Sequence, residues 1–205
     1  MNRNFPLSDE LLNSARAEFR KYGFAEANVG RIATAAGISK KTIYKYVPSK
    51  EALLVEVMRS VVSGPAATMD LSDANTSPRK WLTAYLTRFA QLAFSEEGVT
   101  SYRLMMSEGT RFPEVARIYI ETIKAFGIRP LADQLSNYTS TGTLVVTDTV
   151  RSATMLMAMV LADALRDAAL GIAPPPKGME LDDLVASSVD VFFYGVAVKG
   201  TGHRL

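Results

Sequence analysis

The chain has 205 residues, of which 48% are apolar and 21% are charged, so it can bury a sizeable core and is too hydrophobic to be disordered. It contains no cysteine, and its one histidine, His203, lies close to the C-terminal end. This composition excludes a disulfide framework and a thiolate metal site, and it nearly excludes histidine-based zinc sites and Ser-His or Cys-His catalysis.

Charge is unevenly distributed along the chain, whose net charge is +2. Residues 1–60 hold ten Lys or Arg and six Asp or Glu, a balance of +4, whereas the remaining residues hold thirteen and fifteen, a balance of −2. The basic N-terminal part therefore indicates an anionic partner. Because the chain opens without an apolar run of signal-peptide length and its most apolar stretch, 153–162, is too short to span a bilayer, we expect a cytoplasmic protein.

The first two predicted helices are short and well punctuated. The first spans 8–22, with Ser8 as its N-cap and Gly23 as its left-handed end. Asn28 can cap the second helix, which Gly37 closes. A tight turn containing this glycine then leads into a third helix.

The third predicted helix belongs to the stretch SKKTIYKYVPSK, residues 39–50, which contains four lysines, two tyrosines and no acid. Ser39 caps a helix from Lys40 to Tyr46, and Pro48 ends it. Three helices with a tight turn between the second and third form a helix-turn-helix arrangement. A fourth helix follows from residue 50 to about 63, where Gly64-Pro65 is expected to break it.

The rest of the chain is also predicted to be helical. Residues 138–146 are rich in β-branched side chains but have no strand to pair with, so we interpret them as a loop. The sequence therefore predicts an all-α fold of about nine helices, with a helix-turn-helix domain over 1–48, a connecting helix over 49–64 and a larger helical bundle over 65–205. The five helices expected in the bundle span 77–95, 101–109, 113–137 with an interruption near 127–130, 147–170, and 181–199.

The third helix has one face that suits a nucleic-acid groove. On a helical wheel Ile43 points toward the core, and Lys40, Lys41, Tyr44 and Lys45 lie on the opposite side, with Thr42 at the edge. The N-terminal residues of a recognition helix lie nearest the bases, where lysine can reach phosphate or guanine. The helix starts at Asn28 and Ser39 can also accept a phosphate. A merely solvated lysine-rich face is the alternative, and the residues alone leave both open.

A set of positions at fixed relative spacing carries a family resemblance. They are Phe19, Gly23-Phe24, Ile32-Ala33, Ala36-Gly37-Ile38-Ser39, Thr42-Ile43-Tyr44, Tyr46-Val47 and Lys50-Glu51-Ala52-Leu53. Over residues 23–54 the chain resembles the DNA-binding domain of the TetR/AcrR family of transcriptional regulators. The resemblance implies a cytoplasmic, nucleoid-associated protein of bacterial type that binds double-stranded DNA.

The resemblance also implies a role for each DNA-facing position. Lys40, Lys41 and Thr42 would face bases and nearby phosphates, and Tyr44 and Tyr46 would contact the backbone. Lys45 would face either, Lys50 would clamp a phosphate, and Asn28 would act as cap and phosphate contact. Gly30 departs from the family pattern, because a long or basic side chain is common there, so a base contact from this position is absent. The complete expected DNA-binding set is Asn28, Ser39, Lys40, Lys41, Thr42, Tyr44, Lys45, Tyr46 and Lys50.

A weaker resemblance covers part of the bundle. Residues 101–135, with Arg103-Leu104, Glu108 and the run from Arg111 to Ala116, resemble the C-terminal domain of AefR-like members. This implies a ligand-responsive homodimer, interpreted as a repressor, that binds a palindromic operator and is released by a small, largely apolar effector. No cofactor is expected.

Composition alone gives modest support for an effector pocket. Methionines cluster at 105, 106, 155, 157 and 159, and aromatic residues add to them at Phe89, Phe94, Tyr102, Tyr119 and Phe126. Methionine suits irregular apolar cavities, although each one taken singly could simply fill a core. The expected pocket residues are Arg103, Met105, Phe126, Met155, Met159 and Asp163.

The last two long helices are expected to form a dimer interface, because each has a broad apolar face and two from each subunit would make a four-helix bundle. The expected interface residues are Met157, Leu161, Val189, Phe192, Phe193 and Val196. Two other functions are alternatives to a regulator. A protein-interaction factor of this fold that uses DNA as a co-ligand stays open, whereas an enzyme is disfavoured because Cys, a usable His and a phosphate loop are missing.

Overall fold

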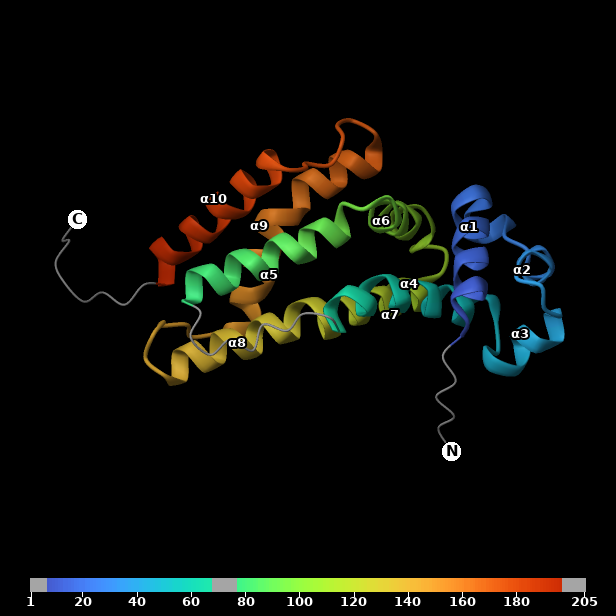
Figure 1. Ribbon diagram of the computed structural model, residues 1–205, viewed down its shortest axis with the longest axis horizontal. Coiled ribbons are helices and arrows are strands. Elements are labelled where there is room, and N and C mark those ends of the chain that lie inside the picture. The colour runs from blue at the N-terminus through green and yellow to red at the C-terminus, as the bar shows by residue number, and fades with distance from the viewer. Residues whose placement is uncertain (1–6, 68–76, 197–205) are drawn as a thin grey trace.

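The computed structural model describes residues 7–67 and 77–196, with side chains described for 7–60 and 77–194. The described residues form helices throughout and contain no β-strand, which confirms the all-α prediction. Counting α7, η1 and α8 as the continuous rod they form, the described part has nine helical rods, as expected (Figure 1). The elements are α1 (Asp9–Glu26), α2 (Val29–Ala35), α3 (Lys40–Tyr46), α4 (Lys50–Ala67), α5 (Pro78–Ala93), α6 (Glu96–Glu108), α7 (Pro113–Ile123), the π-helical η1 (Lys124–Ile128), α8 (Arg129–Ser140), α9 (Thr149–Leu170) and α10 (Met179–Val196).

The molecule is elongated, and its two ends are built from different parts of the chain (Figure 1). Helices α1, α2 and α3 form one end, here called the head, and α5, α8, α9 and α10 form the other. Helix α4 leaves the head and packs along α7, and it also contacts α5 and α6. No described helix is long and apolar enough to cross a membrane.

The described residues form two hydrophobic cores, one at each end of the molecule. The head core contains Phe24, Ile32 and Ile43, but it also takes in Met105 of α6 and Val115 of α7. The Phe24 ring lies edge-on against Phe112, with centroids 4.5 Å apart. The second core joins α5, α8, α9 and α10, with Leu82, Leu131, Leu156 and Val189 among its fully buried members. The head is therefore packed directly on the start of α7 and is not an independent body on a linker.

The predicted caps of the head are confirmed. Ser8 Oγ accepts the Leu11 N–H at 3.3 Å, Asn28 Oδ1 accepts the Gly30 N–H at 2.7 Å, and Ser39 Oγ accepts the Thr42 N–H at 3.0 Å. Gly23 has a φ of 69°, as its predicted role at the end of the first helix requires, yet helical turns resume beyond it as far as Glu26.

Several predicted helix boundaries were wrong by a few residues. Helix α6 begins at Glu96, where Ser95 Oγ caps the Gly98 N–H at 3.0 Å, five residues before the predicted start. Helix α9 is capped by Asp148, whose Oδ1 accepts the Arg151 N–H, and not by the predicted Thr147. Helix α4 continues past Gly64-Pro65 to Ala67, so the pair lies in its last turn and does not end it.

The interruption predicted near 127–130 is a π-helical segment and not a break. Pro130 has no N–H to give the preceding turn, and the Tyr85 hydroxyl donates to the Gly127 carbonyl at 2.7 Å. Gly127 also allows close packing, since a Cβ atom there would lie 2.5 Å from the Phe89 ring. The sequence break thus becomes a point of contact between η1 and α5.

Candidate functional site

Helix α3 presents the exposed basic face that its sequence predicts. Ile43 is fully buried, while Lys40, Lys41, Tyr44 and Lys45 are exposed on the other side. Among the described residues none of these lysines forms an ion pair. The Lys40 ammonium lies 5.8 Å from the centre of the Tyr44 ring, a weak contact that leaves its charge in solvent. The face is therefore a set of cations that can still pair with an anion.

The start of α3 is held by two hydroxyls. Ser39 Oγ lies 2.8 Å from Thr42 Oγ1 and caps the Thr42 N–H, so both side chains are fixed at the N-terminal end of the helix. At the other end the Lys45 ammonium lies 5.7 Å from the centre of the Tyr46 ring, and 46% of Tyr46 is exposed. The predicted residues of α3 thus lie together on one surface.

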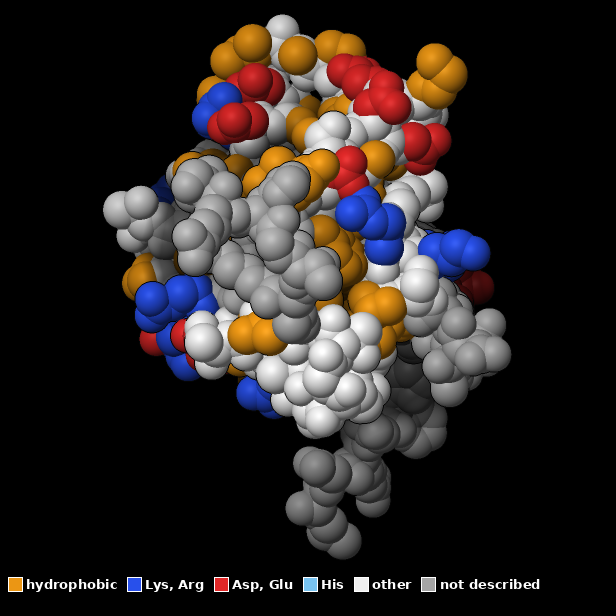
Figure 2. Space-filling view, turned by 90° about the vertical axis from the view of Figure 1, so that its left-hand side faces the viewer, with side chains coloured by type: hydrophobic (Ala, Val, Ile, Leu, Met, Phe, Trp, Pro, Cys, Tyr) orange, Lys and Arg blue, Asp and Glu red, His pale blue; other side chains and the backbone are white. Residues whose placement is uncertain are grey.

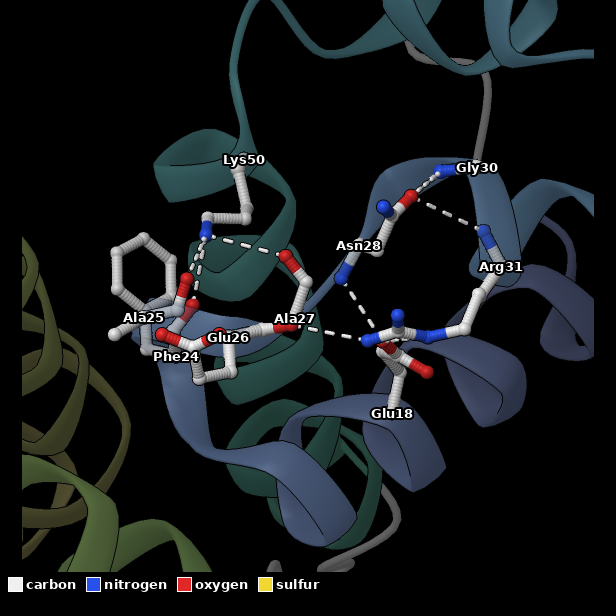
Figure 3. A network of polar contacts seen from close by, with 9 residues as sticks. All are labelled: Glu18, Phe24, Ala25, Glu26, Ala27, Asn28, Gly30, Arg31 and Lys50. Carbon is white, nitrogen blue, oxygen red and sulfur yellow. Dashed lines mark hydrogen bonds and ion pairs between the residues drawn. The ribbon is translucent and has the colours of Figure 1, made fainter.

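Asn28 belongs to a polar network that sequence reasoning missed (Figure 3). Its backbone N–H donates to Glu18 Oε1 at 2.8 Å, and the same oxygen accepts Arg31 Nε at 2.8 Å. The Arg31 guanidinium also donates to the Glu26 carbonyl and lies 4.3 Å from the centre of the Tyr22 ring. The network therefore fastens the start of α2 to α1. Spacing gave no signal for it, because residues 18 and 31 lie on different helices.

Glu18 is the buried acid of this network, with only 8% of its side chain exposed. Burial alone would raise the pKa of its carboxyl, but the hydrogen bonds from Arg31 and from the Asn28 N–H together outweigh burial, and its pKa is lowered. The Glu18 hydrogen bond likewise raises the pKa of Arg31. Both groups are held in their charged forms.

Gly30 lies close to the cap that precedes it. Asn28 Oδ1 folds back onto the Gly30 N–H, and a Cβ atom at position 30 would lie 2.9 Å from that oxygen. A side chain at position 30 would therefore make the Asn28 amide shift from its present place.

Lys50 has a different environment from the lysines of α3, and this corrects its expected role. Its ammonium donates to the carbonyls of Phe24, Ala25 and Ala27 at 2.8, 3.0 and 3.2 Å, and it lies 4.7 Å from the centre of the Phe24 ring (Figure 3). An ammonium group has three donors, and all three are used here. Lys50 therefore joins the start of α4 to the end of α1 and has no proton left for a phosphate.

A cavity of about 190 Å³ lies between the two cores, lined by α4, α5, α6, α7 and α9 and open to the surface on one side. Met58 comes from the head core, whereas Phe89 and Leu165 belong to the second core. Its polar lining consists of Ser101, Tyr102 and Tyr119, and no charged side chain lines it within the described residues. Burial, with a smaller contribution from nearby Tyr102, raises the pKa of Tyr119 to about 12.

None of the six predicted pocket residues lines this cavity. Met155 and Met159 are 61% and 39% exposed on the outer side of α9, and the exposed Asp163 pairs with Arg166. The other three lie elsewhere: Met105 is in the head core, Phe126 packs on the second core, and Arg103 caps α9 by donating to the carbonyls of Ala168 and Ala169. The prediction failed because methionine content does not indicate which side of a helix faces inward.

The predicted dimer-interface residues mostly lie inside the protomer. Met157, Val189 and Phe192 are buried in the second core, and Leu161 lines the cavity. The Phe193 ring lies 4.8 Å from the Arg79 guanidinium. The Val196 side chain falls outside the described residues. The apolar faces that were expected at the interface therefore pack mainly within one subunit.

Two family models match the chain. Residues 11–57 match the model of bacterial regulatory proteins of the tetR family, and residues 80–195 match the C-terminal domain of AefR-like transcriptional repressors. The chain is also similar to the HTH-type transcriptional regulator RutR of Escherichia coli strain K12, with 30% identity over 126 residues, which are 62% of this chain and 51% of that protein. The chain therefore spans about half the length of the curated relatives it matches.

Solved structures show the same fold. A TetR-family regulator from Mesorhizobium loti superposes with a TM-score of 0.80 and 25% identity, covering 92% of this chain and 96% of that one. The flavonoid-responsive regulator FrrA gives 0.71 and 25%, covering 94% and 97%. FadR from Bacillus subtilis, solved with stearoyl-CoA, shares the fold at 0.67 with 15% identity, covering 91% and 97%.

Proposed function

Since the chain belongs to the TetR family of bacterial transcriptional regulators, we propose that it is a dimeric, ligand-responsive repressor that binds a palindromic operator through α3 and leaves it when a small, largely apolar effector binds. The observation that carries this proposal is the exposed face of α3, where three lysines point outward and no acid from the described part of the chain pairs with them. The end of the molecule opposite the head carries acidic and basic side chains together (Figure 2).

In this proposal α3 enters the major groove with its N-terminal end nearest the bases. Lys40, Lys41 and Thr42 contact bases and adjacent phosphates, Tyr44 and Tyr46 donate to the backbone, and Lys45 binds a phosphate. Asn28 and Lys50 act by positioning, because the former fixes α2 and the latter fixes α4 against α1. The head therefore presents α3 in one orientation before DNA arrives.

The dimer interface is assigned to the outer sides of α9 and α10. Met155, Met159 and Ala162 lie one turn apart along the exposed side of α9, and Val191 and Tyr194 are 60% and 91% exposed on α10. Large apolar side chains left in solvent on two helices that pack together are typical of a homodimer interface. Met155→Glu with Val191→Glu should give monomers in analytical ultracentrifugation, and a dimer of unchanged affinity would contradict the assignment.

The cavity is the proposed effector site, because its position between the two cores can couple occupancy to the head. Met58 lines the cavity from the middle of α4. Lys50 joins the start of the same helix to α1. An effector shifts the dimer between two spacings of its heads only if it binds one of them more tightly. The relative FrrA is described as flavonoid-responsive, which supports ligand control in this fold.

The direct test is binding of the purified protein to DNA from upstream of its own gene, measured by fluorescence anisotropy against unrelated DNA of the same length. Specific binding whose log affinity falls linearly with log salt concentration is expected. Equal affinity for both DNAs would contradict an operator-binding function. A protein partner retained at high salt without DNA would instead favour the protein-interaction factor.

A further inference from the structure

The cavity between the two cores contains hydroxyl groups without partners. Among the described residues Ser101, Tyr102 and Tyr119 make no hydrogen bond through their hydroxyls, although all three line the cavity and are partly buried. None of the three hydroxyls is fully buried, so each can take a hydrogen-bond partner that enters the cavity. Polar groups that line an apolar pocket fix the orientation of a ligand. These hydroxyls therefore suit an occupant with at least one oxygen or nitrogen atom.

The size of the cavity limits the occupant to a small molecule. An apolar cavity of about 150 Å³ holds benzene, so about 190 Å³ admits one ring with a short substituent. The long acyl chain and phosphates of stearoyl-CoA, which Bacillus subtilis FadR binds, do not fit this volume. The several rings of a flavonoid exceed it as well.

The lining also selects for a neutral molecule. Apart from the three hydroxyl-bearing residues it consists of apolar side chains and Gly98, and a carboxylate placed there without a cation would carry a large desolvation cost. Two arginines, Arg16 and Arg20, line a small adjoining cavity that shares Met58 and Ser101 with this one. Arg20 pairs with Glu96, and Arg16 donates through its two terminal nitrogens to Asn13 and Ser60, which leaves only its buried Nε without a partner.

We infer that the cavity binds a neutral, single-ring molecule with one hydroxyl or carbonyl group, which hydrogen-bonds to Tyr119 and its neighbours Tyr102 and Ser101. This inference rests on the proposed function of the cavity as the effector site. The ring packs between Phe89 and Leu161, and Ile120, which is 48% exposed, lies at the mouth. Because Tyr119 is a neutral donor and acceptor at neutral pH, it serves an alcohol, a phenol or a carbonyl equally.

The test compares two probes of matched shape, 4-ethylphenol and 4-ethylbenzoate, by isothermal titration calorimetry on the full-length protein at pH 7. We expect 4-ethylphenol to bind at least tenfold more tightly than the carboxylate, and Tyr119→Phe to weaken its binding by about tenfold, which corresponds to one lost hydrogen bond. Tyr138→Phe, a partly buried tyrosine that packs on the second core outside the cavity, is the matched control and should bind like wild type. No binding of 4-ethylphenol at millimolar concentration, or tighter binding of 4-ethylbenzoate, would overturn the inference.

A second measurement separates this inference from the proposed function. Operator affinity is determined with and without saturating 4-ethylphenol. If the probe binds and Tyr119→Phe weakens it, but operator affinity is unchanged, the ligand class stands and effector control by this cavity fails. If the protein binds its operator but not the probe, the ligand class fails and the DNA-binding function stands.

Discussion

The α3 face and the cavity differ in charge and in the number of helices that form them. The face is a single helix of seven residues whose lysines are exposed, whereas the cavity draws on five helices and has no charged lining within the described residues. The first can attract a polyanion from a distance, because its charges lie in solvent. The cavity can hold only a molecule that fits its volume and carries no charge. The two ends of the proposed switch therefore recognise their partners by different physical means.

The head adds a second contrast, between cations that face outward and cations that hold the fold. Within the described residues Lys41 and Lys45 have no carboxylate partner, but the Lys50 ammonium meets three carbonyls and Arg31 meets Glu18. Lysine occurs in both groups, so residue type does not separate them. What separates them is whether another segment supplies acceptors nearby, which are backbone carbonyls for Lys50 and a carboxylate for Arg31.

The largest effect is expected from the outward-facing group. Lys41→Ala with Tyr44→Ala removes one cation and one exposed hydroxyl from the centre of the α3 face, and operator binding should fall by at least a hundredfold in fluorescence anisotropy. The dimer should persist in analytical ultracentrifugation, because neither side chain is buried. Lys177→Ala, an exposed lysine between α9 and α10, is the charge-matched control. Near-normal operator binding by the double variant would show that α3 is not the recognition helix.

The next prediction compares Lys50, whose ammonium is bonded within the head, with Lys45, which is exposed on α3. Lys50→Met removes three charge-assisted hydrogen bonds but keeps most of the stem, so the free energy of unfolding should fall by about 2 kcal/mol in urea titrations. The slope of log operator affinity against log salt should not change. Lys45→Ala should leave stability unaltered and make that slope shallower by about 0.9 for each lost phosphate contact, hence roughly twice that in a dimer. A shallower slope in Lys50→Met would place Lys50 on the DNA.

A smaller effect with a defined pH dependence is expected at Glu18. The folded-state pKa of Glu18 is lowered, so its charged form stabilises the protein above the unfolded pKa of about 4.3, and that stabilisation is lost as pH falls through the folded value. Glu18→Gln should therefore lower the free energy of unfolding by about 1–2 kcal/mol at pH 7, with the deficit shrinking below about pH 4.3. Glu26→Gln, an exposed position on the same helix, should show neither change. A deficit that is constant with pH would contradict the ionic role.

The contrast between face and cavity also explains what the sequence could predict. The α3 face depends on residues within one turn of each other, and its caps, its buried Ile43 and its exposed lysines all follow from local rules. The same rules located most helices, and they failed by a few residues where two capping residues compete, as at Thr147 and Asp148.

The cavity could not be predicted in the same way, because each of its walls depends on how far a helix is rotated about its axis. Leu161 and Met159 are two residues apart on α9, yet Leu161 lines the cavity and Met159 faces outward. Both are large and apolar, so composition cannot separate them. The partners of Lys50 and Glu18 were missed for a related reason, since their acceptors and donors come from segments that only the tertiary fold brings together.

The smallest effect follows from the absence of charge around the cavity. Between 50 and 200 mM salt, binding of 4-ethylphenol should change by less than about twofold, because a neutral ligand in an uncharged site releases no counter-ions. Operator affinity should fall by about a thousandfold or more over the same range if six or more phosphates are contacted. Calorimetry and anisotropy on one preparation give both numbers, and unchanged calorimetric enthalpy would confirm that the site itself is intact. Probe binding that weakens steeply with salt would instead indicate that a guanidinium, from Arg16 or Arg20 beyond Met58, reaches the ligand.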